Sequence, residues 1–275
     1  MKNTHPLMRI VLTLFTILVA MFFVLPLLWF AFAPFNEQAT LGIATPDRLS
    51  LANFETVFDN QLAIRALIQN SMIIGVGSMI GTALVAALTA YGLSRGSVPG
   101  RGVLTYVLIL FSSVVTGTAS MVPIFLLIFN LGLINTHLGV ILVMVGGLLP
   151  AAIFIMQDFV DSVPRSYEEA AIVAGASPFR IFLDVTFPMI RPGMMVVAIW
   201  AFVNAWGAFL IPFILLRSPD KLPAAVAFYQ FYDEIGSPQI RLISAYAVLY
   251  TAPAILLYLL VNWRYGFRFF GGIKQ

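Results

Sequence analysis

The stretch Tyr167-Glu168-Glu169-Ala170-Ala171-Ile172-Val173-Ala174-Gly175-Ala176-Ser177-Pro178 is a polar interruption in a very apolar chain. Ser166 precedes Glu169 by three residues, which is the spacing of a capping box and predicts a helix that begins at Ser166. Gly175 is expected to end this helix, because a residue without a Cβ adopts the left-handed conformation at low cost. The stretch therefore begins with a short, well-capped helix.

A second short helix is expected directly after this turn. Ser177 can cap its N-terminus, and Pro178 then occupies the first helical position, where proline is favoured. Pro188 and Pro192 are expected to stop the second helix before the next apolar segment. The loop 158–193 is thus predicted to form a helix–turn–helix between two membrane spans.

Six apolar stretches surround this loop and predict an all-α, polytopic membrane protein. Each has roughly 20 residues or more, enough to cross about 30 Å of hydrocarbon, and none contains Asp, Glu, Lys or Arg. No linker or low-complexity tract separates them, so we predict a single domain, 1–275. The stretches cover about 10–33, 70–93, 103–126, 138–157, 194–216 and 243–263.

The distribution of Lys and Arg predicts the orientation. Ten of the 15 basic residues lie in the N-terminus, the 95–101 loop, the 158–193 loop and the C-terminus. The positive-inside rule places these segments, and both termini, in the cytoplasm. The first apolar run is longer than the core of a signal peptide, so we expect it to be a retained helix. A short helix is expected on the outer side at about Leu51–Phe58.

Composition excludes several functions. The chain has no Cys and two His, far apart in sequence, so a metal site is not expected. It has no phosphate-binding loop with which to hydrolyse ATP, and its acids form no convergent catalytic set, so we do not expect an enzyme. The net charge of +3 is scattered, which does not indicate nucleic-acid binding.

The first helix of the 158–193 loop has the character of a docking element, and the alternative is an amphipathic segment that rests on the lipid headgroups. It is acidic and small-faced, so anionic lipid would repel it and its alanines add little insertion energy. Small residues allow close approach of another protein. The residues expected at this contact are Glu168, Glu169, Ala170, Ala171, Ala174, Gly175, Ala176 and Ser177.

The spacing Glu169-Ala170-Ala171, three residues, Gly175, nine residues, Val185-Thr186-Phe187-Pro188 resembles the EAA loop of permease subunits in binding-protein-dependent ABC importers. Ala174 stands where the family often has Asp. Further similarity comes from Asn70-Ser71, Ala90–Arg95, Leu131–Thr136 and Gly271–Lys274, and the pattern is nearest to the smaller permease of maltose-type carbohydrate importers.

The resemblance implies a multi-pass subunit of a bacterial or archaeal plasma membrane. Its partners would be a second permease subunit, two ATPase subunits that carry ATP and Mg²⁺, and an extracytoplasmic solute-binding protein. The chain itself would bind no cofactor. The hairpin would be a coupling helix, with Glu169 meeting the ATPase and Gly175 setting the turn.

Uncharged polar residues in the spans are candidates for contact with the cargo. The absence of charge in the predicted spans indicates a neutral solute, such as a sugar. The candidate pathway residues are Ser113, Thr116, Asn204, Trp206, Tyr246 and Tyr250, each of which also suits a structural role in helix packing. Tyr229, Phe231 and Tyr232 are candidates for contact with the binding protein or for an interfacial aromatic belt.

One alternative stays open, a stand-alone carrier driven by an ion gradient. The predicted spans lack the ionisable residues that proton- and sodium-coupled carriers usually bury. Carbonyl and hydroxyl oxygens alone can nevertheless bind sodium. The alternative predicts uptake by this chain without ATP.

Overall fold

The computed structural model describes residues 6–40, 42, 48–96, 99–100, 102–103, 106–107, 110, 118–233 and 235–265. Within these ranges the secondary structure is helical, apart from one isolated bridge between Tyr232 and Pro238. The helices form two compact units, one from Met1–Ala63 with Phe228–Gln275 and the other from Ile64–Ala227. The prediction of a single domain stays a prediction.

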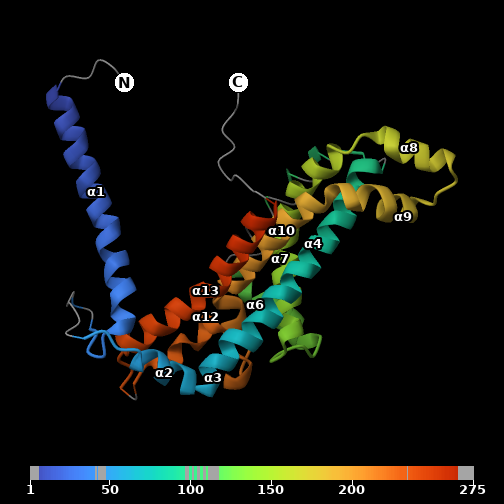
Figure 1. The fold of residues 1–275 in the computed structure, drawn as a ribbon. Coiled ribbons are helices and arrows are strands. Elements are labelled where there is room, and N and C mark those ends of the chain that lie inside the picture. The colour runs from blue at the N-terminus through green and yellow to red at the C-terminus, as the bar shows by residue number, and fades with distance from the viewer. Residues whose placement is uncertain are drawn as a thin grey trace. The chain divides into compact units, whose positions relative to one another are not determined.

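The first unit contains the long helices α1 (Pro6–Phe32) and α13 (Ile240–Tyr265), which Figure 1 draws at the two ends of the colour scale. The short elements are η1 (Ala33–Phe35), α2 (Ala52–Asp59), α3 (Gln61–Ile64), whose last residue belongs to the second unit, and η6 (Phe228–Phe231). The helix α2 confirms the short helix expected near residues 51–58. Tyr246 forms the core, because it is fully buried and its hydroxyl donates to the Ala63 carbonyl at 3.2 Å.

The second unit is built around α4 (Ser71–Arg95), α7 (His137–Asp161) and α10 (Phe187–Trp206), which pack against one another. Small residues allow the close contact: a Cβ on Gly193 would lie 2.3 Å from Cγ of Phe159. The connecting elements are η2 (Arg65–Asn70), η3 (Thr118–Ser120), α6 (Met121–Asn130), α8 (Arg165–Val173), α9 (Pro178–Ile181), η4 (Phe182–Thr186), α11 (Leu210–Leu215), η5 (Pro219–Lys221) and α12 (Ala224–Ala227).

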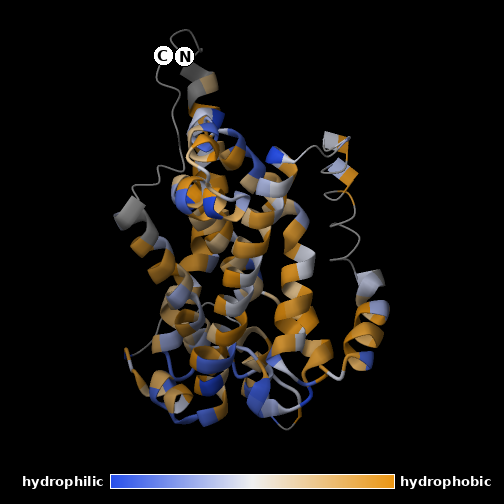
Figure 2. Ribbon diagram, turned by 90° about the vertical axis from the view of Figure 1, so that its right-hand side faces the viewer, coloured by the Kyte–Doolittle hydropathy of each residue, from blue (hydrophilic) through white to orange (hydrophobic). Residues whose placement is uncertain are grey.

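Five helical segments of the described residues are long and apolar enough to cross a membrane. Figure 2 shows apolar residues along the helices and hydrophilic residues at the turns between them. The predicted third span, 103–126, is described only in part, so the sixth crossing stays a prediction. The five segments are Ile10–Phe35, Gln61–Arg95, His137–Asp161, Pro178–Trp206 and Ile240–Leu260.

The predicted span 194–216 is wrong in its bounds. The helix α10 ends at Trp206, and a separate helix, α11, follows after a break at Gly207. Upstream, the helix does not stop at Pro188 or Pro192, because α9, η4 and α10 follow one another without a break. The segment η4 is a π-helix, in which the Phe187 amide donates to the carbonyl of Phe182 five residues back. This wider turn lies just before Pro188. In a regular α-helix, the proline ring would clash with the carbonyl four residues earlier, and the wider turn reduces that clash.

One end of the second unit is closed by the segment 217–224, here called the 217–224 loop. Asn135, which precedes α7, accepts hydrogen bonds on Oδ1 from the amides of Arg217 and Ser218 at 3.0 and 3.1 Å. Its Nδ2 donates to Oγ of Ser218 at 2.8 Å. Asn135 has a φ of +59°, a left-handed conformation that asparagine tolerates better than most residues.

A second asparagine holds the same loop from the start of α4. Asn70 is buried, and its Nδ2 donates to the carbonyls of Asp220 and Leu222, each at 2.9 Å. Ser71 Oγ accepts from the Ala224 amide at 2.8 Å. Both α4 and α7 therefore begin at the 217–224 loop, and both end at the 158–193 segment. The side of the membrane on which each end lies stays a prediction.

Candidate functional site

The helices α8 and α9 form a hairpin that extends beyond the C-terminal end of α4 (Figure 1). Gly175 ends α8 with a φ of +81°. Its amide donates to the Ile172 carbonyl at 2.9 Å, and the Ala176 amide donates to the Ala171 carbonyl at 3.0 Å. This is the Schellman arrangement, which satisfies the last carbonyls of a helix. The predicted glycine turn is confirmed.

Of the two predicted N-caps, the one at Ser177 forms and the one at Ser166 does not. Ser177 caps α9, because its Oγ accepts from the Arg180 amide at 3.4 Å and Pro178 takes the first helical position, as expected. The predicted cap at Ser166 is wrong. The residue before α8 is Pro164, in an extended conformation, and Ser166 lies inside the first turn. A capping-box serine must stand outside the helix, so this box does not form.

Glu168 points into the protein, contrary to the expectation that it would face a partner. Only 7% of the residue is exposed. Nε of Arg95, the last residue of α4, lies 2.9 Å from both carboxylate oxygens of Glu168. Oγ1 of Thr186 donates to the same carboxylate at 3.0 Å. A carboxylate held in this way is not available to another subunit.

Arg95 also contacts the end of α7. The Nη2 atom of Arg95 donates to the carbonyls of Val160 and Val163 at 3.0 and 2.9 Å. Its other terminal nitrogen lies 3.9 Å from Oδ1 of the half-exposed Asp161. A cation at the C-terminal ends of α4 and α7 is also favoured by the dipoles of both helices.

The Arg95–Glu168 pair is largely removed from water, with side-chain exposures of 12% and 9%. Removal of one partner from a buried ion pair typically costs about 3–5 kcal/mol, because the other charge stays buried without its counterion. From the sequence, Arg95 was expected to add positive charge to a cytoplasmic loop and to end the Ala90–Arg95 motif, with no partner predicted for it. The signal available was an arginine at the end of an apolar span, inside the Ala90–Arg95 motif.

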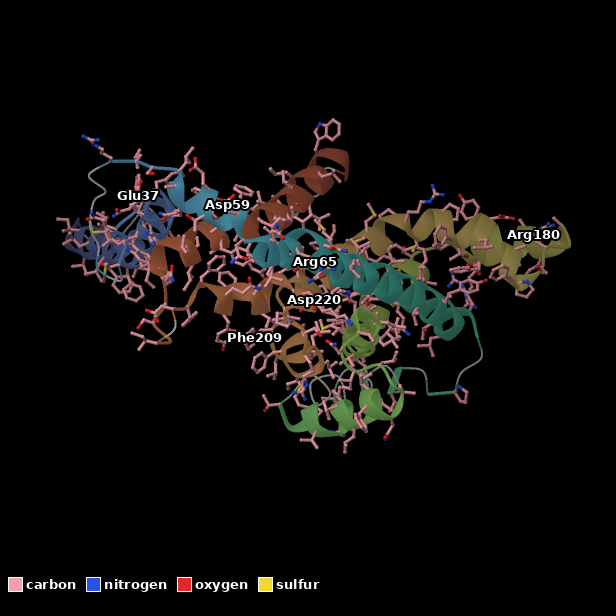
Figure 3. The ribbon with its side chains drawn as sticks, turned by 90° about the horizontal axis from the view of Figure 1, so that it is seen from below. Glu37, Asp59, Arg65, Arg180, Phe209 and Asp220 are labelled. Atoms are coloured by element: carbon pink, nitrogen blue, oxygen red, sulfur yellow. The ribbon has the colours of Figure 1, made fainter. Side chains whose placement is uncertain are left out.

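The hairpin carries four exposed apolar residues, which together we call the hairpin patch. It consists of Tyr167, Ile172, Val173 and Phe179, which are 56, 60, 90 and 67% exposed. Arg180 lies near the free end of the hairpin (Figure 3).

The remaining predicted contact residues of the hairpin differ in exposure. Ala171 and Ala176 are half-buried. The others, which are Glu169, Ala170, Ala174, Gly175 and Ser177, are exposed.

The predicted pathway residues separate into exposed and buried groups. Asn204 is exposed on α10; its Nδ2 donates to the Trp200 carbonyl at 2.8 Å, and its Oδ1 has no partner among the described residues. Trp206 is 4% exposed and stacks on Phe202 at 5.4 Å, which argues against contact with cargo. Ser113 and Thr116 lie outside the described residues.

The two pathway tyrosines belong to the first unit. Tyr246 is a core residue, in edge-to-face contact with Phe228 at 4.9 Å, so it has no surface to offer a solute. Tyr250 is partly exposed and contacts the same phenylalanine at 5.7 Å.

Of the three residues expected to meet a binding protein, Tyr229 and Tyr232 are 57 and 40% exposed and lie 5.7 Å apart. Phe231 is 2% exposed and packs on Tyr246 at 5.0 Å, so its predicted role is wrong. Residues 228–231 form a turn of 3₁₀-helix, which directs neighbouring aromatic rings to different sides.

Residues 84–267, which include the hairpin, match the family described as "Binding-protein-dependent transport system inner membrane component". This chain belongs to that family. The family consists of transport permeases rather than enzymes. The chain is thus a permease subunit of the carbohydrate-uptake type of ABC importer, and a multi-pass protein of the plasma membrane.

Curated relatives of this permease extend over most of its length. The diacetylchitobiose uptake system permease protein NgcG of Streptomyces coelicolor is 33% identical, over 86% of this chain and 78% of the relative. The galactooligosaccharides transport system permease protein GanQ of Bacillus subtilis is 30% identical, over 88 and 87% of the two chains. The maltodextrin permease protein MdxG of the same organism is 27% identical, over 94 and 92%.

The fold of the permease is similar to that of a chain in a solved bacterial ABC transporter that imports the acidic polysaccharide alginate. The TM-score is 0.77 at 19% identity, and the match covers 96% of this chain and all of the other. A second structure, of the alginate transporter in complex with its alginate-bound periplasmic protein, gives a TM-score of 0.64 at 16% identity. These similarities show the fold alone.

Proposed function

We propose that this permease forms half of the translocation pathway of an ATP-driven importer for a neutral oligosaccharide or related polar solute. A separate ATPase subunit, which binds ATP and Mg²⁺, docks on the α8–α9 hairpin. A second permease completes the pathway, a second ATPase subunit completes the motor, and an extracytoplasmic binding protein delivers the solute.

The observation that carries this proposal is the hairpin patch. Val173 is 90% exposed at the C-terminal end of α8, just before the turn at Gly175. Exposed apolar side chains that are gathered on one element are typical of a protein contact. The flanking Glu169, Ala170 and Ala174 are exposed and add small or charged groups around the patch.

Two observations support a neutral cargo. The exposed face of α10 presents the free amide oxygen of Asn204, which can accept a hydrogen bond from a sugar hydroxyl. The curated relatives carry names of neutral saccharides, namely diacetylchitobiose, galactooligosaccharides and maltodextrin. An acidic solute would need Arg or Lys on its path.

The test is a pair of matched substitutions in the assembled complex. Val173→Glu places a charge in the hairpin patch, whereas Ile235→Glu places the same charge at an equally exposed apolar residue of the first unit, 91% exposed. Neither change disturbs a buried contact. We expect Val173→Glu to lower co-purification of the ATPase subunit with the permease, and Ile235→Glu to leave it unchanged.

Equal recovery of the ATPase with both variants would contradict docking on the hairpin. Transport measurements in proteoliposomes then separate the two transport mechanisms. Uptake by this chain alone, abolished by an ionophore and indifferent to ATP, would identify an ion-driven carrier instead of an ATP-driven permease.

A further inference from the structure

We infer that Arg95 is a positioning residue that fastens the α8–α9 hairpin to the ends of α4 and α7, so that hairpin and helices move as one body. The inference rests on the proposed docking function, because it says how force applied at the hairpin reaches the transmembrane helices. It assigns to Arg95 and Glu168 a role in coupling without any contact to the ATPase.

Apart from Glu168, α8 has few contacts with the rest of the second unit. All residues of α8 are described, and Glu168 is the one buried residue among them. Apart from its chain connections, α8 contacts mainly α9 and η4, which belong to the same hairpin polypeptide. The buried carboxylate of Glu168 therefore makes the principal side-chain contact between α8 and α4.

The geometry of the guanidinium group also supports the inference. Arg95 donates to Glu168 on α8 and to the carbonyls of Val160 and Val163 at the end of α7. A planar group with several donors in fixed directions can hold three elements at once, whereas the point charge of a lysine cannot. The contact fixes orientation as well as distance.

The segment η4, which follows α9, is attached to the end of α4 at the same carboxylate. Thr186, at the end of η4, is fully buried and donates to the Glu168 carboxylate. Beside it, the ring of Phe182 lies 5.0 Å from that of Tyr91 on α4. Both arms of the hairpin thus converge on the last turn of α4.

The consequence concerns α4, which is remote from the hairpin in sequence: Arg95 and Glu168 are 73 residues apart. The chain itself connects the hairpin only to α7 and α10. The ion pair connects the hairpin directly to α4 as well. Movement of the hairpin on closure of the ATPase should therefore displace α4 together with α7, without a change in the α8–α4 distance.

The experiment measures the distance between α8 and α4 by pulsed electron–electron double resonance. The chain has no cysteine, so spin labels can be placed at Ser166→Cys on α8 and Leu88→Cys on α4, both at exposed positions. The sample is the complete complex in lipid nanodiscs, without nucleotide and after trapping with ATP and orthovanadate. We expect one narrow distance distribution that is the same in both states.

Variants of Arg95, the anchor between α4 and the hairpin, sharpen the test. With Arg95→Gln we expect a broader Ser166–Leu88 distribution that shifts on trapping, and with Arg95→Lys an intermediate width. Arg191→Gln, which neutralises an exposed arginine of the same unit, should leave the distribution narrow. A distance that shifts on trapping in the wild type, or an unchanged distribution in Arg95→Gln, would overturn the inference.

The wild-type measurement decides the question even if Arg95→Gln does not assemble. Failure of the docking proposal is recognised separately, because it would appear as unchanged ATPase recovery with Val173→Glu. In that case the distance distribution without nucleotide still tests the anchor.

Discussion

The α8–α9 hairpin and the 217–224 loop are attached to opposite ends of α4, but they are attached in different ways. The hairpin is held mainly by one buried ion pair, between Arg95 and Glu168, which Thr186 supports with a hydrogen bond, and its apolar residues stay exposed. The loop is held by neutral asparagine side chains that bond its backbone at several points. A single charged anchor leaves one surface free for a partner, whereas distributed backbone bonds fix the course of a chain.

The largest expected effect is loss of the charged anchor. Arg95→Met should lower the free energy of unfolding by about 3–5 kcal/mol, because it leaves the Glu168 carboxylate buried without a counterion. Thermal unfolding of the assembled complex measures the change. The double variant Arg95→Met, Glu168→Leu should recover much of the loss. Equal melting temperatures for the single variant and the wild type would mean that the pair is not buried as described.

A smaller loss is expected at the start of α7. Asn135→Ala removes three side-chain hydrogen bonds and leaves a non-glycine residue at a φ of +59°, so we expect a loss of about 1–3 kcal/mol. Asn135→Asp retains the acceptor oxygen and should recover part of it. If Asn135→Ala were as damaging as Arg95→Met, the contrast between one anchor and distributed bonds would fail.

Substitution of the hairpin glycine should act on the shape of the hairpin. Gly175→Val puts a branched side chain at a φ of +81° and should cost about 1–2 kcal/mol of strain. The matched control is Gly132→Val, at a φ of +68° in the turn before α7. Both should lower the melting temperature by similar amounts, but only Gly175→Val should reduce recovery of the ATPase subunit. Equal recovery would contradict a role for the turn in docking.

The smallest expected effect comes from the supporting hydroxyl. Thr186→Val keeps the shape of the side chain and removes its hydrogen bond to Glu168, which is worth about 1 kcal/mol. The bidentate contact from Arg95 remains. A decrease in stability as large as that of Arg95→Met would assign the main anchor to Thr186 and not to the arginine.

Local sequence signals predicted the parts of the hairpin that depend on neighbouring residues. Gly175 and Ser177 were identified because a left-handed turn and an N-cap are properties of a few consecutive residues. The start of α8 was misplaced, since the serine–glutamate spacing also fits a helix that begins one residue earlier, after Pro164. The continuity through Pro188 depended on a π-helical turn that no local rule indicated.

The parts that were missed depend on contacts distant in sequence. The spacing around Glu168 and Glu169 did not reveal which of the two acids points inward, because the partner, Arg95, is 73 residues away from Glu168. For the same reason, Trp206 and Phe231 resembled exposed recognition residues in sequence but are core residues in the structure. Burial is set by packing between helices, and the local sequence pattern around a residue does not reveal which distant residues pack against it.

The π-helical segment Phe182–Thr186 also sets the rotational phase of the hairpin. One additional residue in a helical turn rotates everything beyond it by about 100° about the helix axis. Deletion of a single residue here would restore an ordinary α-helix, but it would turn α9 and its Phe179 side chain by roughly a quarter of a revolution relative to α10. The direction in which the hairpin faces is therefore encoded in the length of one five-residue segment, independently of its composition.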